Sequence, residues 1–155
     1  MSSEVAFKVF KLSALGYCCT QIMLKMALEE EGTCNEDLIR SANGLCNGIG
    51  GKQRTCGVLI GGIMIIGLYG GKAKENEYYK ENYGDMVHEF TGWFEEEFGS
   101  MDCVDIIGVN KFDDGESRYM LKCGDIIIKS YEKVIEILTE NGYEFGVREN
   151  EQTNI

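Results

Sequence analysis

Proline is absent from this 155-residue chain, and histidine and tryptophan each occur once. Proline is the residue that most strongly breaks a helix, so the 20 glycines are left as the main points where helices end or bend. The single histidine, His88, leaves any mixed cysteine and histidine metal site dependent on one imidazole, and we expect His88 at the surface. This composition is typical of a helical chain punctuated by glycine.

Positive charge is also scarce, with 15 lysines and arginines against 26 aspartates and glutamates, a net charge of −11. A strongly acidic chain is repelled by phosphate groups, which argues against nucleic acid or an anionic membrane surface as a partner. The first residues, MSSE, lack the basic segment followed by an apolar one that marks a signal peptide. We therefore expect a cytoplasmic protein that binds neither nucleic acid nor membrane.

No two cysteines have the CxxC spacing, so the chain encodes neither a thioredoxin motif nor a zinc ribbon locally, and no CxxCH motif is present to attach haem. Structural disulfides are rare in the cytoplasm. The cysteines are therefore expected to serve redox chemistry, to bind metal, or to pack as small apolar side chains. There are seven of them: Cys18, Cys19, Cys34, Cys46, Cys56, Cys103 and Cys123.

The longest uncharged run covers residues 55–71 and ends at Lys72. It is too short to span a bilayer, which takes about 20 apolar residues, and too long for a typical strand of about 4 to 8 residues. The run predicts a helix that is apolar on every side and forms the central buried element of the fold. Gly57 and Gly61 lie four residues apart and would let a neighbouring backbone approach one face of it.

At the head of this run, Thr55 is expected to cap the helix, which places Cys56 in the first turn. Unpaired amides and the positive end of the helix dipole favour a thiolate there, and Lys52 and Arg54 add positive charge just upstream. Cys56 is the first candidate for a nucleophile.

The glycine-rich residues 44–51 contain neither a Walker motif nor GxGxxG, so we expect close backbone packing there rather than a nucleotide site.

Helical periodicity accounts for most of the remaining chain. We predict an all-α, single-domain helical bundle of five or six helices around the central buried glycine-rich helix, occupying residues 1–145, with a polar C-terminal tail over residues 146–155. A loop is expected over residues 109–122, with a turn at 113–115. The other helical segments are residues 4–31, interrupted at Gly16; a short helix capped by Thr33 in a TxxE pattern; residues 76–98, with an aromatic stripe; a helix capped by Ser100; and residues 124–141.

Three further cysteines fall on inward faces or at helix starts. Cys19 shares an apolar face with the methionines that follow it, Cys103 lies in the first turn after Ser100, and Cys123 is in phase with the apolar face of the last helix. Any pairing or cluster of these residues with Cys56 must be assembled by the tertiary fold.

Several of these pieces resemble the family of redox-active proteins named for its cysteine pattern, C_GCAxxG_C_C, which is related to part of the split-Soret cytochromes. The matching pieces are GYCC at 16–19, GIGG at 48–51, TCGVLIG at 55–61, FGSMDC at 98–103, and Cys123 before the last helix. The resemblance covers about residues 10–140 and implies a helical protein whose family cysteines are Cys19, Cys56, Cys103 and Cys123. Thr55 and Val58 stand where the family favours glycine and alanine. Cys18, Cys34 and Cys46 match no family cysteine.

Residues and resemblance together lead to three hypotheses. The first is a thiol/disulfide redox or electron-transfer protein in which Cys56 attacks a partner's disulfide and Cys19 resolves the mixed disulfide, although four cysteines allow three pairings. The second is a metal or iron–sulfur binding module that uses the same four cysteines, with zinc or a cluster as cofactor. The third is a non-catalytic helical interaction protein in which the cysteines merely pack. A redox partner protein, a homodimer and enzymatic activity all remain open at this point.

Overall fold

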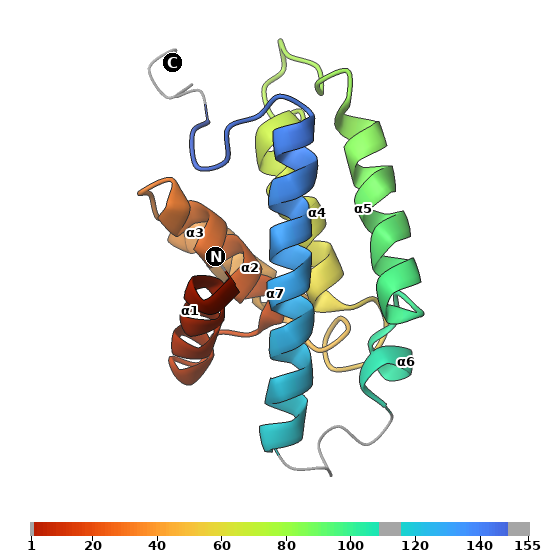
Figure 1. The fold of residues 1–155 in the computed structure, drawn as a ribbon. Coiled ribbons are helices and arrows are strands. Elements are labelled where there is room, and N and C mark those ends of the chain that lie inside the picture. Colours follow the sequence, from red (N-terminus) through yellow and green to blue (C-terminus); the bar gives the residue numbers. More distant parts are fainter. Residues whose placement is uncertain (1, 109–115, 149–155) are drawn as a thin grey trace.

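The computed structural model describes residues 2–108 and 116–148, and of residues 2 and 116–121 it gives the backbone alone. Within these residues the chain forms seven α-helices and one short 3-10 helix, so the all-α prediction is confirmed and the predicted number of five or six helices is too low. Figure 1 shows them as one bundle, with α7 running along its length. The elements are α1 Ser2–Ala14, α2 Cys19–Glu30, α3 Glu36–Ala42, η1 Asn43–Leu45, α4 Gly57–Gly70, α5 Tyr83–Phe98, α6 Cys103–Ile107 and α7 Glu116–Glu140.

The interruption predicted at Gly16 is a complete break between α1 and α2, which accounts for the additional helix. Gly16 has φ of 95°, a left-handed conformation that favours glycine, and the amide of Tyr17 returns to the carbonyl of Leu12 at 3.2 Å. The start of α3 differs from the prediction. Asn35, and not Thr33, caps this helix, because its side chain accepts a hydrogen bond from the amide of Leu38 at 3.1 Å.

Helix α4 packs against α2, α5 and α7 (Figure 1). Its glycines are the points of closest approach, since Gly57 and Gly61 meet α2 and Gly62 meets the ring of Phe90 on α5. The prediction that this helix is buried all round is wrong. Ile60, Ile63, Met64, Gly67 and Leu68 are only partly buried and follow one stripe along the helix, which no other described helix covers completely.

Helix α5 begins at Tyr83, later than the predicted residue 76. The residues before it form a loop because side chains there bind backbone groups: the ammonium of Lys72 donates to three carbonyls, and a carboxylate oxygen of Glu77 accepts from the amides of Ala73 and Lys74. Tyr79 lies in this loop and is 61% exposed, so it does not belong to the aromatic stripe. The rest of that stripe is confirmed, with Met86, Phe90 and Phe94 fully buried on α5.

At the other end of the chain, α7 begins at Glu116, well before the predicted residue 124, and residues 116–122 of the predicted loop are helical. The rest of that loop, with its turn at 113–115, lies outside the described residues. Ile127, Tyr131, Val134 and Leu138 are buried as predicted. Helix α6 starts directly after Asp102, so Cys103 is its first residue.

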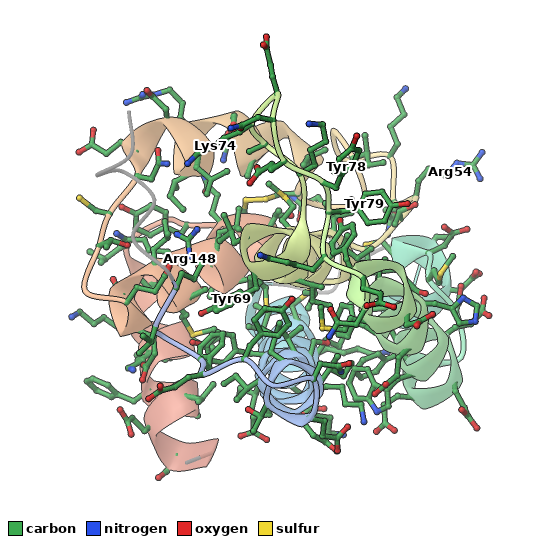
Figure 2. The ribbon with its side chains drawn as sticks, turned by 90° about the horizontal axis from the view of Figure 1, so that it is seen from above. Arg54, Tyr69, Lys74, Tyr78, Tyr79 and Arg148 are labelled. Carbon is green, nitrogen blue, oxygen red and sulfur yellow. A yellow bond between two sulfur atoms is a disulfide. The ribbon has the colours of Figure 1, made fainter. Side chains whose placement is uncertain are left out.

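After α7 the chain folds back over the bundle. The amide of Gly146 donates to the hydroxyl of Tyr69 on α4 at 2.9 Å, and Arg148 pairs with Glu31 at 2.6 Å beside the same tyrosine (Figure 2). Residues 149–155 of the predicted polar tail lie outside the described residues.

None of the helices in the described part of the chain has both the length and the apolar character needed to cross a bilayer. The homodimer, which the sequence left open, receives no support from the fold of the single chain.

Candidate functional site

Three of the predicted site cysteines stand at the N-terminal ends of three helices. Cys19 is the first residue of α2, Cys56 is the residue just before α4, and Cys103 is the first residue of α6. Cys56 and Cys103 are buried, at 6% and 5% exposure, and Cys19 is half-buried. The position of Cys56 differs by one residue from the prediction, because Cys56 itself and not Thr55 precedes the first helical residue.

The starts of α4 and α6 are held together by a short antiparallel pairing. Thr55 and Asp102 form an isolated bridge. On either side of it, the amide of Cys56 donates to the carbonyl of Met101 at 2.8 Å and the amide of Cys103 donates to the carbonyl of Arg54 at 2.6 Å. This pairing places the two cysteines side by side although 47 residues separate them in the chain (103 minus 56).

Cys19 reaches the same point from α2. A Cβ built on Gly57 would lie 2.6 Å from the sulfur of Cys19 and 2.5 Å from the hydroxyl of Thr20, so only glycine allows the two helices to approach this closely. The Thr20 hydroxyl donates to the carbonyl of Gly57 at 2.9 Å and fixes the contact. The close approach of the first helical segment, predicted from Gly57 and Gly61, is therefore confirmed, and it brings Cys19 to Cys56.

Burial controls the acidity of these thiols. It raises the pKa of Cys56 to about 12, and the nearby sulfurs of Cys19 and Cys103 add to the rise. The amides of Val58 and Leu59 at the start of α4 act in the opposite direction but are outweighed. Burial likewise raises the pKa of Cys19. The expected thiolate at Cys56 is therefore wrong. The guanidinium of Arg54, which was expected to favour it, extends away from the bundle (Figure 2).

Cys123, the fourth predicted residue, lies half-buried on α7. Helix α7 packs against α6, and Cys123 lies in the N-terminal third of α7. The structure thus brings Cys19, Cys56 and Cys103 near one another and places Cys123 on a helix that contacts α6.

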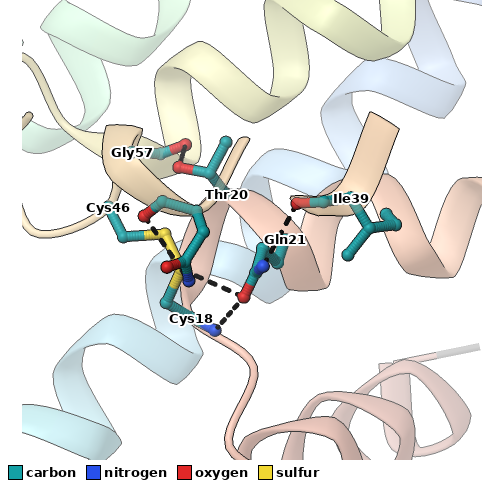
Figure 3. The surroundings of a disulfide bond; sticks show 7 residues. Cys18, Thr20, Gln21, Ile39, Cys46 and Gly57 are labelled. Carbon is teal, nitrogen blue, oxygen red and sulfur yellow. Dashed lines mark hydrogen bonds between the residues drawn. A yellow bond between two sulfur atoms is a disulfide. The ribbon is translucent and has the colours of Figure 1, made fainter. Parts of the chain in front are cut away.

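The sequence analysis missed a disulfide between Cys18 and Cys46, whose Cα atoms lie 6.1 Å apart (Figure 3). Cys18 precedes α2 and points away from Cys19, which leaves it free to meet the segment after η1. The available signal was the adjacent pair Cys18 and Cys19, whose side chains must leave the helix start in different directions. Cys34, the remaining cysteine, is exposed before α3.

A left-handed stretch of backbone directly follows Cys46. Residues 47–51 all have positive φ, from 57° at Asn47 to 78° at Gly51, and they include Ile49 at 64°. A β-branched residue in this region is strained, at a cost of about 1–3 kcal/mol. The stretch is closed by hydrogen bonds such as that from the Arg54 amide to the Gly48 carbonyl at 3.0 Å, and its Asn47 amide donates to the sulfur of Cys19. Strained backbone thus contacts a site cysteine.

The described residues contain no group of three histidine, cysteine, aspartate or glutamate side chains placed to hold one metal ion. His88 is exposed on α5, as predicted.

A comparison with protein families finds one match over residues 17–137, to the model described as "Putative redox-active protein (C_GCAxxG_C_C)". The matched span includes the starts of α2, α4 and α6, where the three cysteines meet, and most of α7. Neither the curated proteins nor the solved structures gave a match.

Proposed function

Since the chain belongs to the C_GCAxxG_C_C family of redox-active proteins, we propose that it is a thiol/disulfide redox protein whose exchanging pair is Cys19 and Cys56. The observation that supports this most is that these two thiols and Cys103 lie near one another at the starts of three helices, with the Cys19 sulfur against Gly57. Nearby thiols drawn from different helices can be joined and separated without unfolding any helix. A cytoplasmic location and a redox partner protein are part of the proposal.

The roles of the two cysteines follow from burial. As whole residues, Cys19 is half-buried and Cys56 is 6% exposed, and on this difference we assign Cys19 as the thiol that meets the partner. This exchanges the roles expected from the sequence. The amides of Asn47 and Thr20 donate to the Cys19 sulfur and favour its thiolate once contact with a partner or a proton acceptor removes the proton.

The exchange takes place in two balanced steps. The Cys19 thiolate attacks a disulfide of the partner, a mixed disulfide forms, and the first partner sulfur leaves as a thiolate. Cys56 then loses its proton and attacks the Cys19 sulfur, which releases the second partner thiol. Two thiols of this protein are oxidised to one disulfide, and one partner disulfide is reduced to two thiols. Cys103 and Cys123 are proposed as supporting members of the site.

The test is thiol mapping after oxidation, in a Cys34→Ser background that removes the exposed thiol. Fully reduced protein is treated with a peptide disulfide and its disulfides are located by mass spectrometry. We expect Cys19 joined to Cys56, and in Cys56→Ser a mixed disulfide trapped at Cys19. If Cys56→Ser forms the same disulfides as its parent, the pair is wrongly assigned. If the parent keeps all these thiols reduced, the protein is the non-catalytic interaction protein considered above.

A further inference from the structure

The disulfide between Cys18 and Cys46 has no place in the four-cysteine family pattern, yet it lies within a few residues of the proposed exchanging pair. Its two sulfurs are not equally accessible, because Cys18 is half-buried while Cys46 is 5% exposed. A nucleophile from outside can therefore reach the sulfur of Cys18, and the sulfur of Cys46 is the leaving group.

A cavity of about 430 Å³ lies between α2 and α3, and it reaches this disulfide through two of its lining side chains. Gln21 and Asn43 both line the cavity and both approach Cys18. The Gln21 side-chain oxygen accepts from the Cys18 amide at 3.2 Å, and its nitrogen donates to the carbonyl of Ile39 on α3 at 3.1 Å (Figure 3). The Asn43 side-chain nitrogen lies 3.8 Å from the Cys18 sulfur. The Gln21 and Asn43 side chains thus separate a molecule in the cavity from the Cys18 sulfur, and they must turn aside for a thiol in the cavity to attack it.

The walls of the cavity carry charges of both signs. Lys25 lies 3.8 Å from Glu29 and over the ring of Tyr17 at 5.3 Å, and Arg40 lies 4.0 Å from Glu36. All five residues line the cavity. A paired cation and carboxylate on each of the two walls match a ligand that itself carries both ammonium and carboxylate groups. The volume falls in the usual range for small-molecule sites, about 300–1,000 Å³.

We propose that the Cys18–Cys46 disulfide is a second redox site, and that it is reduced by a small zwitterionic peptide thiol bound in the cavity between α2 and α3. The thiolate of the first peptide attacks the Cys18 sulfur, the Cys18–Cys46 bond breaks, and Cys46 leaves as a thiolate and takes up a proton. A second peptide thiolate attacks the peptide sulfur of the mixed disulfide and releases Cys18. Two peptide thiols become one peptide disulfide, and the protein disulfide becomes two thiols.

The position of Cys18 assists the second step. Cys18 stands at the N-terminus of α2, a helix of 12 residues, where the helix dipole favours a negative charge. The Asn43 amide at 3.8 Å adds a donor to the sulfur. A thiolate stabilised in this way is a good leaving group. None of these contacts depends on thiol exchange between Cys19 and Cys56. The proposal for the Cys18–Cys46 disulfide and the proposed function can therefore fail separately.

The experiment follows reduction of the Cys18–Cys46 disulfide in the full chain carrying Cys34→Ser, because Cys34 also lines the cavity. Reduced glutathione serves as the zwitterionic thiol and 2-mercaptoethanol as a small neutral one. We expect the rate to saturate with glutathione and to stay linear with 2-mercaptoethanol. The double variant Lys25→Gln/Arg40→Gln should raise the half-saturating glutathione concentration about five-fold, the loss expected when exposed charge contacts are removed, and should not change the rate with 2-mercaptoethanol.

The matched control is Lys52→Gln/Arg54→Gln, which removes two exposed cations that do not line the cavity and should leave both rates unchanged. A Cys46→Ser variant, treated with oxidised glutathione, should carry the glutathione adduct on Cys18. The proposal is overturned if the glutathione rate is linear, if both double variants act alike, or if Cys18 acquires no adduct. It is also overturned if only a protein dithiol reduces the disulfide. A Cys19→Ser variant should keep this behaviour, which separates the result from the fate of the proposed function.

Discussion

Cys56 lies at a helix start, as the sequence predicts, but the pKa of its thiol is raised and not lowered. Its position at a helix start supplies two amides that favour the thiolate, as expected. The same position lies inside the bundle, and loss of solvent outweighs those amides. A sequence shows the helix start but not the burial of the side chain there. The proposed role of attacking thiol therefore passes to Cys19, whose pKa is also raised by burial but which is the more exposed of the two residues.

A pH dependence of stability follows from this acidity. The pKa of Cys56 is about 12 in the folded protein, against an ordinary value of 9.0. Between these pH values the folded state keeps a proton that the unfolded state releases, so the stabilisation is complete below about pH 9 and is lost as the pH rises toward 12. We expect the urea midpoint of unfolding to fall between about pH 8 and pH 10.5, and to fall less in Cys56→Ala.

The control for this measurement is Cys34→Ala, because Cys34 is exposed. Its urea midpoint should follow the wild-type pH dependence. Equal slopes for Cys56→Ala and Cys34→Ala would show that Cys56 is not responsible for the alkaline loss.

Among the elements, the contact between α2 and α4 determines the geometry of the site. Gly57 and Gly61 let α2 lie close enough for Cys19 and Thr20 to touch the start of α4. A methyl group at Gly57 would meet the Thr20 hydroxyl at 2.5 Å and the Cys19 sulfur at 2.6 Å. The Cys19 and Thr20 side chains, or the two helices, must move to accommodate it.

We therefore expect Gly57→Ala to lower the free energy of unfolding by about 1–3 kcal/mol, as overpacked positions do, and to slow formation of the Cys19–Cys56 disulfide. Gly92 provides the matched control, because it lies inside helix α5, is exposed, and has no neighbouring atom within 4 Å of an added Cβ. Gly92→Ala should raise stability by about 0.5–1 kcal/mol through helix propensity. Urea unfolding of both variants tests this, and similar losses in the two would contradict the packing argument.

The elements also show what the sequence could predict. Periodicity identified the buried faces of α5 and α7. Met86, Phe90 and Phe94 repeat at helical spacing on α5, and Tyr131, Val134 and Leu138 do so on α7. It could not place the start of α5, because the preceding loop depends on contacts that Lys72 and Glu77 make with backbone groups. The Cys18–Cys46 disulfide also escaped prediction, since it requires the left-handed turn after Cys46 and the packing of α3 beside α2.

At the scale of the whole molecule, the Cys18–Cys46 disulfide closes a loop with a sequence separation of 28 that contains α2, α3 and η1. Closing a loop of this size removes entropy from the unfolded chain and is worth roughly 3–4 kcal/mol. We expect the double variant Cys18→Ala/Cys46→Ala to unfold at a lower urea concentration than the oxidised protein, and at about the same concentration as the reduced protein. Cys34→Ala should leave the difference between oxidised and reduced protein intact. If oxidised and reduced wild type unfold at the same urea concentration, the loop does not stabilise the fold.

The same loop has a mechanical consequence. When the two ends of the oxidised protein are pulled, the force passes directly from Cys18 to Cys46 through the sulfur atoms, and the 28 residue steps between them carry no tension. An extended residue spans about 3.3–3.6 Å, so reduction would add roughly 90 Å to the length of the stretched chain. Helix α2, which holds Cys19 against α4, lies inside the shielded loop and α4 lies outside it, so the redox state of one bond decides whether α2 bears load together with α4.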